Sequence, residues 1–314
     1  MYYTLINDSL LLIFSFIGML AAFIYITILC RIHEQRTSKV RSLANLLSAN
    51  SCIAGFLLNL FNFIDASIMY HADINIINEN QRQPDSFCVL RGGFRSATLG
   101  ALYHSLCIQA FYRLCCIVHT KHRSSRSYSF YICLIIIQWV ISIGSIIPFL
   151  LFKQIVYNPG GHFCQITLKN LFAFPFMYLI DYFLPLIFII YIYIKIIIYL
   201  RHQSIIERFR RQQPIHMFRH IIYMLIILSI TGIPLRVIFF LTHINHKLVP
   251  YYAQKLGMIF VTFSHASVMT YTLLLTTDVR RTFLRSLRVP YQMTTQIEHI
   301  LPIEIYLPRL NIIH

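Results

Sequence analysis

The chain has 314 residues, of which 57% are hydrophobic and only 12% are charged, and its mean hydropathy is +0.63. A soluble domain usually carries about 25% charged residues. This composition therefore excludes an ordinary soluble protein and indicates a membrane protein. The formal net charge of +16 raises the question of which partner the basic residues contact.

Seven apolar segments follow one another along the chain, and each is long enough to cross a bilayer as a helix. A membrane-spanning helix needs about 20 residues, and no repeat, glycine-rich linker or soluble domain interrupts the series. The predicted fold is therefore all-α, a bundle of seven transmembrane helices. The predicted spans are 9–31, 42–70, 88–119, 127–152, 171–200, 214–243 and 250–277, preceded by an N-terminal tail over 1–8.

The distribution of lysine and arginine predicts how the chain is oriented. Most of these residues lie in the segments 31–41, 113–126, 195–219 and 280–288, which are alternate loops of the predicted bundle. By the positive-inside rule, these segments face the cytoplasm. The N-terminus is then outside a plasma membrane and the C-terminus inside, and the basic loops face anionic lipids and an intracellular protein, not nucleic acid.

The third span joins a cysteine near one face of the membrane to an arginine near the other. A helix from Cys88 to Arg113 rises roughly 37 Å, close to the ~40–45 Å thickness of a bilayer with its headgroups. The arginine lies in the sequence Phe-Tyr-Arg-Leu at 111–114. This span resembles the third helix of the rhodopsin-like (class A) G-protein-coupled receptors, in which the arginine belongs to an Asp-Arg-Tyr motif.

Further residues of that family follow in chain order. Trp139 lies in span four, and Pro185 and Tyr193 in span five have the residue types and the spacing of the family. Pro234 matches the proline that bends helix six, because proline removes a backbone hydrogen bond and kinks a helix. Tyr271 matches the tyrosine of the helix-seven Asn-Pro-x-x-Tyr motif. The resemblance covers about residues 9–289.

The resemblance implies a receptor, not an enzyme, that passes an extracellular ligand signal to a heterotrimeric G protein. In the family, the helix-three arginine faces the G protein, the two tyrosines support the open state and the kinked helix six swings outward. These roles fall here to Arg113, Tyr193, Tyr271 and Pro234. No catalytic motif or phosphate-binding glycine loop is present in the sequence.

Several polar residues of the family's core are absent. The helix-two aspartate position falls on Gly55, and helix six reads Thr-Gly-Ile-Pro at 231–234, without the family's tryptophan. No sodium site, other metal site or cofactor is therefore expected. A non-signalling seven-helix protein or scaffold remains an alternative interpretation, and a transporter is a less favoured one because the spans show no continuous polar path or broken helices.

Two of the eight cysteines, Cys88 and Cys164, fall in predicted extracellular positions. The resemblance implies that they form the family's disulfide between helix three and the second extracellular loop. Such a bond is stable in an oxidising compartment. The alternative is a pair of free thiols in flexible loops.

Charged residues within the predicted spans are candidates for ligand binding, because each costs at least ~2.5–3.5 kcal/mol at mid-helix. Arg91 and Arg95 share one face of span three, Arg236 follows in span six, and Asp65 and Asp181 are the acids at comparable depth. In one interpretation they leave a positive cavity for an anionic group, such as a peptide carboxylate or an acidic lipid. In the other, Arg95 pairs with Asp65 and Arg236 with Asp181, and Arg91 lies among the headgroups.

An amphipathic segment follows the seventh span. Val279, Phe283 and Leu287 recur every four residues, with arginines between them. This pattern predicts a short helix over 278–289 that lies along the inner leaflet and resembles the eighth helix of the family. Residues 290–314 form the expected cytoplasmic tail.

Overall fold

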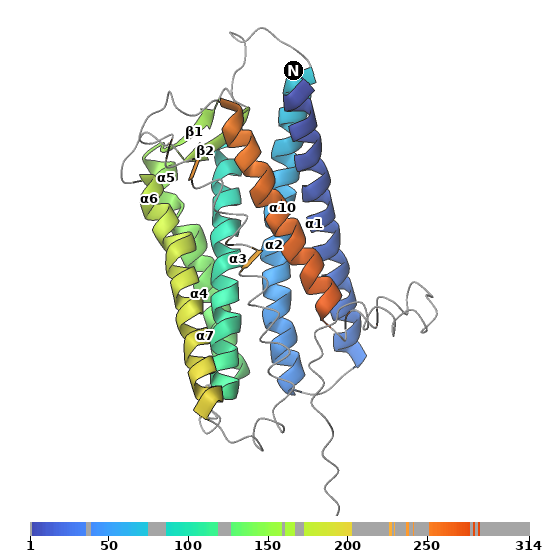
Figure 1. Ribbon diagram of the computed structural model, residues 1–314, viewed down its shortest axis with the longest axis vertical. Coiled ribbons are helices and arrows are strands. Elements are labelled where there is room, and N and C mark those ends of the chain that lie inside the picture. The colour runs from blue at the N-terminus through green and yellow to red at the C-terminus, as the bar shows by residue number, and fades with distance from the viewer. Residues whose placement is uncertain are drawn as a thin grey trace, which may run out of the picture.

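Long helices dominate the computed structural model and run side by side along its long axis (Figure 1). The structure describes residues 2–35, 39–74, 86–118, 127–158, 161–166, 173–202 and 251–276, with a few further positions between 226 and 282. The long helices are α1 (Tyr2–Gln35), α2 (Lys39–Ile74), α3 (Cys88–Ile117), α4 (Tyr128–Gly144), α7 (Leu184–His202) and α10 (Tyr251–Leu275).

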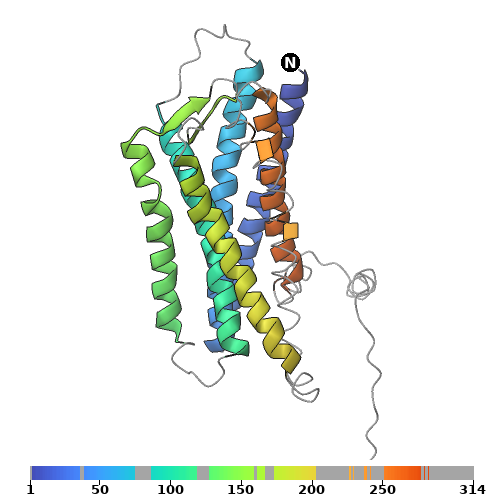
Figure 2. The same ribbon diagram turned by 60° about the vertical axis from the view of Figure 1, so that its left-hand side comes forward.

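Helix α3 lies inside the bundle, where it packs against α2, α4 and α7, while α1 packs against α2 and α10 (Figures 1 and 2). Apolar side chains from these helices form one central core, which includes Tyr25, Leu58, Leu106 and Ile189. Each is at most 2% exposed. The described long helices thus pack side by side in one bundle, which agrees with the predicted seven-helix fold.

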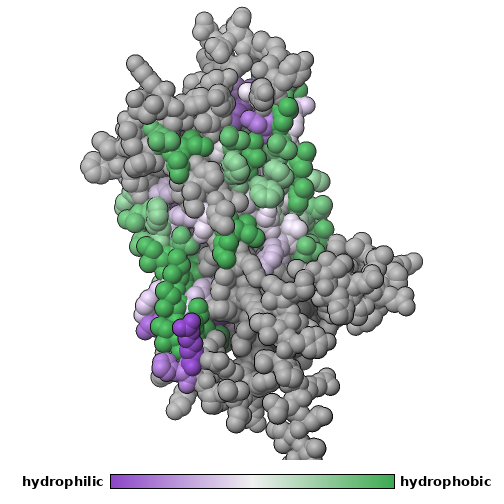
Figure 3. Space-filling model, viewed as in Figure 1, coloured by the Kyte–Doolittle hydropathy of each residue, from purple (hydrophilic) through white to green (hydrophobic). Residues whose placement is uncertain are grey.

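Five of the described helices are long and apolar enough to cross a membrane. Their outward side chains are apolar, as at Ile136 and Val140 of α4, which are 58% and 65% exposed. Figure 3 shows this apolar surface along the helices, with the most hydrophilic residues towards the two ends of the bundle. In water such a surface would be unfavourable, so it indicates a lipid environment.

Helix α3 is not among those five helices because its sequence carries three arginines and many small or polar residues. Its interior position resolves this difference, since its neighbours shield most of its side chains from lipid. Most of the predicted sixth span, 214–243, lies outside the described residues, as do Pro234 and Arg236.

The structure adds detail to the sequence predictions near the two ends of the chain. Helix α1 begins at Tyr2, ahead of the predicted first span, and Asp8 is fully buried there. Of the predicted eighth helix, 278–289, only Val279 and Thr282 are described. Val279 is fully buried and contacts the central core, as expected for the apolar face of such a helix.

A β-hairpin at one end of the bundle adds to the all-α architecture. Strands β1 (Ile155–Asn158) and β2 (Phe163–Ile166) pair antiparallel, with Tyr157 opposite Cys164. The hairpin follows a short helix, α5 (Ile147–Leu151), and lies against the first turns of α3 (Figure 2). A Cβ atom at Gly92 would lie 2.7 Å from the carbonyl oxygen of Cys164, so glycine permits this close approach.

Candidate functional site

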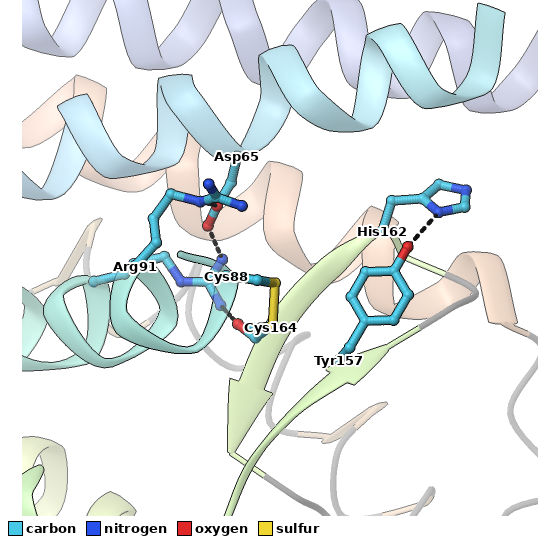
Figure 4. Close-up of a disulfide and its surroundings, with 7 residues drawn as sticks. Asp65, Cys88, Arg91, Tyr157, His162 and Cys164 are labelled. Carbon is cyan, nitrogen blue, oxygen red and sulfur yellow. Dashed lines mark hydrogen bonds and ion pairs between the residues drawn. A yellow bond between two sulfur atoms is a disulfide. The ribbon is translucent and has the colours of Figure 1, made fainter. Parts of the chain in front are cut away.

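A disulfide between Cys88 and Cys164 ties the hairpin to the start of α3 (Figure 4). The two Cα atoms are 5.5 Å apart, and both cysteines are buried. The predicted pairing is therefore confirmed, and the alternative of two free thiols is not. The end of the bundle that carries this bond is called the disulfide end below.

Two arginines of α3 share one carboxylate of α2 beside the disulfide. Arg91 donates from Nε to Oδ1 of Asp65 at 2.6 Å, and Arg95 donates from Nη1 to Oδ2 at 2.8 Å (Figure 4). The arginine side chains are 9% and 12% exposed, and that of Asp65 is 3% exposed. Arg95 also donates to the carbonyl oxygen of Cys164 at 3.2 Å and lies over the Phe163 ring.

This geometry combines features of the two interpretations of the charged residues. The Arg95–Asp65 pair of the second interpretation is present, but Arg91 contacts the same carboxylate and does not lie among headgroups. Two guanidinium groups thus contact one carboxylate among the described residues, an arrangement that contains part of each interpretation. Arg236 lies outside the described residues.

Asp181 lies apart from this group, on the opposite side of α3. It belongs to η3 (Leu179–Phe183), a π-helical turn between α6 (Ala173–Tyr178) and α7. Pro185 follows this turn and has no N–H to donate to the carbonyl group four residues earlier, which explains the local departure from α-helix. The Asp181 carboxylate approaches α3 at Gly100, and its buried Oδ1 has no hydrogen-bond partner among the described residues.

At the other end of the bundle, the structure brings together two of the predicted signalling residues. The Arg113 guanidinium on α3 lies beside the Tyr193 hydroxyl on α7. Tyr112, at the place of the motif's acid, packs its ring edge-on against Tyr131 of α4, with centroids 5.3 Å apart. Tyr271 is partly buried against the central core from α10.

Between the two ends, a chain of side-chain hydrogen bonds joins three helices. Trp139 Nε1 donates to Asn50 Oδ1 at 2.9 Å, Asn50 Nδ2 donates to Gln138 Oε1 at 2.8 Å, and Gln138 Nε2 donates to the Ala101 carbonyl at 2.7 Å. This chain explains why Trp139 is a landmark of the fold. Pro185 likewise faces α3, because its carbonyl oxygen accepts a hydrogen bond from Cys107 Sγ at 3.5 Å.

The sequence matches the family model of seven-transmembrane receptors of the rhodopsin family over residues 26–270. The chain belongs to this family. The solved structure of squid rhodopsin superposes with a TM-score of 0.73, covering 98% of this chain and 93% of that one at 14% identity. At this identity the likeness establishes the fold alone. Comparison with curated protein sequences gave no match.

Membership of the family makes the chain a multi-pass receptor of the plasma membrane and not an enzyme. The receptor keeps the family's disulfide and helix-three arginine without the polar core. Gly55 occupies the place of the family's helix-two aspartate. A Cβ atom at this position would lie 2.5 Å from the Met269 side chain. Among the described residues, no group of three or more His, Cys, Asp or Glu side chains is placed to hold a metal ion.

The receptor also contains a charged cluster that the sequence analysis did not predict. Lys255 Nζ of α10 contacts Asp8 Oδ2 of α1 at 3.2 Å and Asp73 Oδ2 of α2 at 2.9 Å. His162 Nε2 of the hairpin contacts Asp73 Oδ1 at 3.2 Å, and the Tyr157 hydroxyl lies 3.1 Å from His162 Nδ1. We call these five residues the cap cluster. Most of these residues are far apart in the sequence, so no local pattern indicated that they would come into contact.

Proposed function

We propose that this receptor passes the signal of an extracellular ligand to a heterotrimeric G protein. The disulfide end then faces outwards with the N-terminus, and the C-terminus lies inside, in keeping with the basic segments of the sequence. The proposal retains a receptor domain over 9–277, an eighth helix over 278–289 and a cytoplasmic tail over 290–314.

The observation that carries this proposal is the place of Arg113. Its guanidinium lies beside Tyr193 at the end of the bundle opposite the disulfide. Guanidinium has five N–H donors in a planar array, which suits the carbonyl groups of a docked peptide segment. A G-protein segment that enters between α3 and α7 would replace the Tyr193 hydroxyl as the partner of Arg113, and Tyr193, Tyr271 and the bend at Pro234 would support the open form.

Arg113→Ala is expected to abolish G-protein activation at matched surface expression, because it removes these donors. The measurement is the response of cells carrying a panel of Gα sensors, with and without pooled peptides and acidic lipids. Lys153→Ala removes an exposed charge at the disulfide end and is expected to leave the response unchanged. Equal responses from wild type and Arg113→Ala would contradict the proposed role, and silence of the wild type in every pool would favour the non-signalling scaffold.

For the ligand, we propose an anionic group that docks on Arg91 and Arg95. These side chains lie beside the disulfide and share Asp65, and Arg95 also reaches the Cys164 carbonyl oxygen of the hairpin. A guanidinium group has five N–H donors, so an incoming carboxylate or phosphate would accept hydrogen bonds from Arg95 in a planar, charge-assisted arrangement. Asp181 and Arg236 remain candidate ligand contacts from the sequence, although Asp181 lies apart from the arginine pair and Arg236 lies outside the described residues.

Arg95→Ala is expected to weaken the binding of an anionic ligand at least tenfold, since a hydrogen bond to a charged group contributes about 1.5–3 kcal/mol. Arg95→Lys keeps the charge but not the planar donor array and should give a smaller loss. The readout is ligand potency in the Gα assay, with Lys153→Ala as a control for an exposed charge at the same end. Unchanged potency in Arg95→Ala would remove the anion-binding hypothesis.

A further inference from the structure

The cap cluster joins four separate parts of the chain in a buried position. Asp8 comes from α1, Asp73 from α2, Lys255 from α10 and His162 from the hairpin. Their side chains are 0%, 11%, 1% and 5% exposed, in that order. The cluster therefore fastens the hairpin to three helices from within the protein, in addition to the disulfide that fastens it to α3.

The charges of this cluster balance only when one proton is added. Two carboxylates face one ammonium group, so the cluster has a net charge of −1 while the His162 ring is neutral. An unbalanced charge in a buried place is unfavourable, because the protein interior solvates it poorly. Two groups can hold that proton: the His162 ring and the Asp8 carboxyl, whose Oδ1 is buried without a hydrogen-bond partner among the described residues.

The contacts of His162 suit both states of its ring. Nε2 faces the Asp73 carboxylate, an acceptor, and so carries a hydrogen in either state. Nδ1 faces the Tyr157 hydroxyl, which donates to a neutral ring and accepts from a protonated one (Figure 4). The ring can therefore take up a proton at Nδ1 by a rotation of the hydroxyl hydrogen, without movement of heavier atoms.

The other charged groups near the hairpin belong to the separate contact of Arg91 and Arg95 with Asp65. Arg95 lies over the ring of Phe163, next to His162, and is paired with Asp65 together with Arg91. Cys164 is in the disulfide. Tyr157 and Asp73 contact His162 directly, and Lys255 and Asp8 lie behind Asp73.

We propose that the cap cluster is a proton-binding site, with His162 as the acceptor, through which external pH controls how firmly the hairpin is held. The protonated ring forms an ion pair with Asp73, and the cluster is then neutral. Loss of the proton leaves a hydrogen bond in place of the ion pair and a buried net negative charge. The contribution of the cluster to stability is therefore present at acidic pH and is lost as the pH rises.

The first test uses purified receptor in lipid nanodiscs, which exposes both faces to the same buffer and does not depend on orientation or signalling. Between about pH 5.5 and about pH 8.5, we expect the melting temperature of the wild type to fall by at least about 3 °C more than that of His162→Gln. His202→Gln, which removes an exposed histidine from the other end, should retain the wild-type pH dependence. A His162→Gln protein with the wild-type pH dependence would overturn the proposal.

Asp8→Asn tests the charge balance of the cluster, while the comparison with His162→Gln decides which group accepts the proton. This change leaves one carboxylate to one ammonium group, so the cluster is neutral without an added proton. We expect its melting temperature to vary less with pH than that of the wild type, and an unchanged pH dependence would overturn the proposal. Both melting measurements are independent of signalling, so a failure of the proposed function would leave their results unchanged.

Discussion

Replacement of Cys88 or Cys164 by alanine is expected to lower the free energy of unfolding by about 2–5 kcal/mol. The bond closes a loop with a sequence separation of 76, so its loss returns considerable freedom to the unfolded chain. The cysteines also belong to a small core of their own, with Ile146, Phe149 and Ile155, apart from the central core. The bond thus holds this side of the hairpin to α3, while Phe163 packs separately against Leu11, Met69 and Ile259.

The measurement is the thermal unfolding of purified receptor, together with the fraction that reaches the cell surface. The Cys88→Ala and Cys164→Ala variants and the double variant are expected to behave alike, because each removes the same bond. Cys30→Ala and Cys133→Ala are matched controls, since these cysteines are free and exposed. A double variant as stable as the controls would show that the disulfide adds little to the fold.

Asp65→Ala is expected to destabilise the receptor by about 3–5 kcal/mol, the usual loss when one partner of a buried ion pair is removed. Two guanidinium groups then remain in a buried position without the carboxylate that they share. The effect should exceed that of Arg91→Gln or Arg95→Gln, since either change leaves Asp65 with one arginine. Denaturation of the purified variants measures the differences.

A combined variant separates loss of the ion pairs from loss of packing. Asp65→Asn with Arg91→Gln and Arg95→Gln removes all three charges and is expected to be more stable than Asp65→Ala. Ser67→Ala serves as the control on α2, because Ser67 bonds only to the carbonyl of Phe63 in the same helix among the contacts described. If Asp65→Ala had the same free energy of unfolding as Ser67→Ala, the shared carboxylate would have no structural importance.

The length of the third helix and the positions of its two ends were predictable, because the thickness of a bilayer fixes the length of a helix that crosses it. The segment 88–119 was predicted, and α3 runs Cys88–Ile117, with the disulfide at one end and Arg113 near the other. Arg91 and Arg95 were placed on one face by their spacing alone. Their common contact with Asp65 was less accessible to prediction, because it depends on how α2 is rotated against α3.

The cap cluster and the hairpin show two different limits of sequence analysis. Lys255 and Asp8 are 247 residues apart, and charges near helix ends usually indicate solvent, so nothing local identified their contact. The hairpin did have a local signal. β-Branched and aromatic residues at 155–157 precede Asn-Pro-Gly-Gly at 158–161, which is typical of a strand followed by a turn.

The interior place of α3 has a consequence for how the chain enters the membrane during synthesis. Taken alone, α3 is less suited to lipid than its neighbours, because Arg91, Arg95 and Arg113 each make transfer from water unfavourable. Asp65, which offsets part of this charge, belongs to α2, the span synthesised just before it. We therefore expect α2 to remain beside the insertion machinery until α3 arrives, so that the two helices leave for the bilayer as a pair.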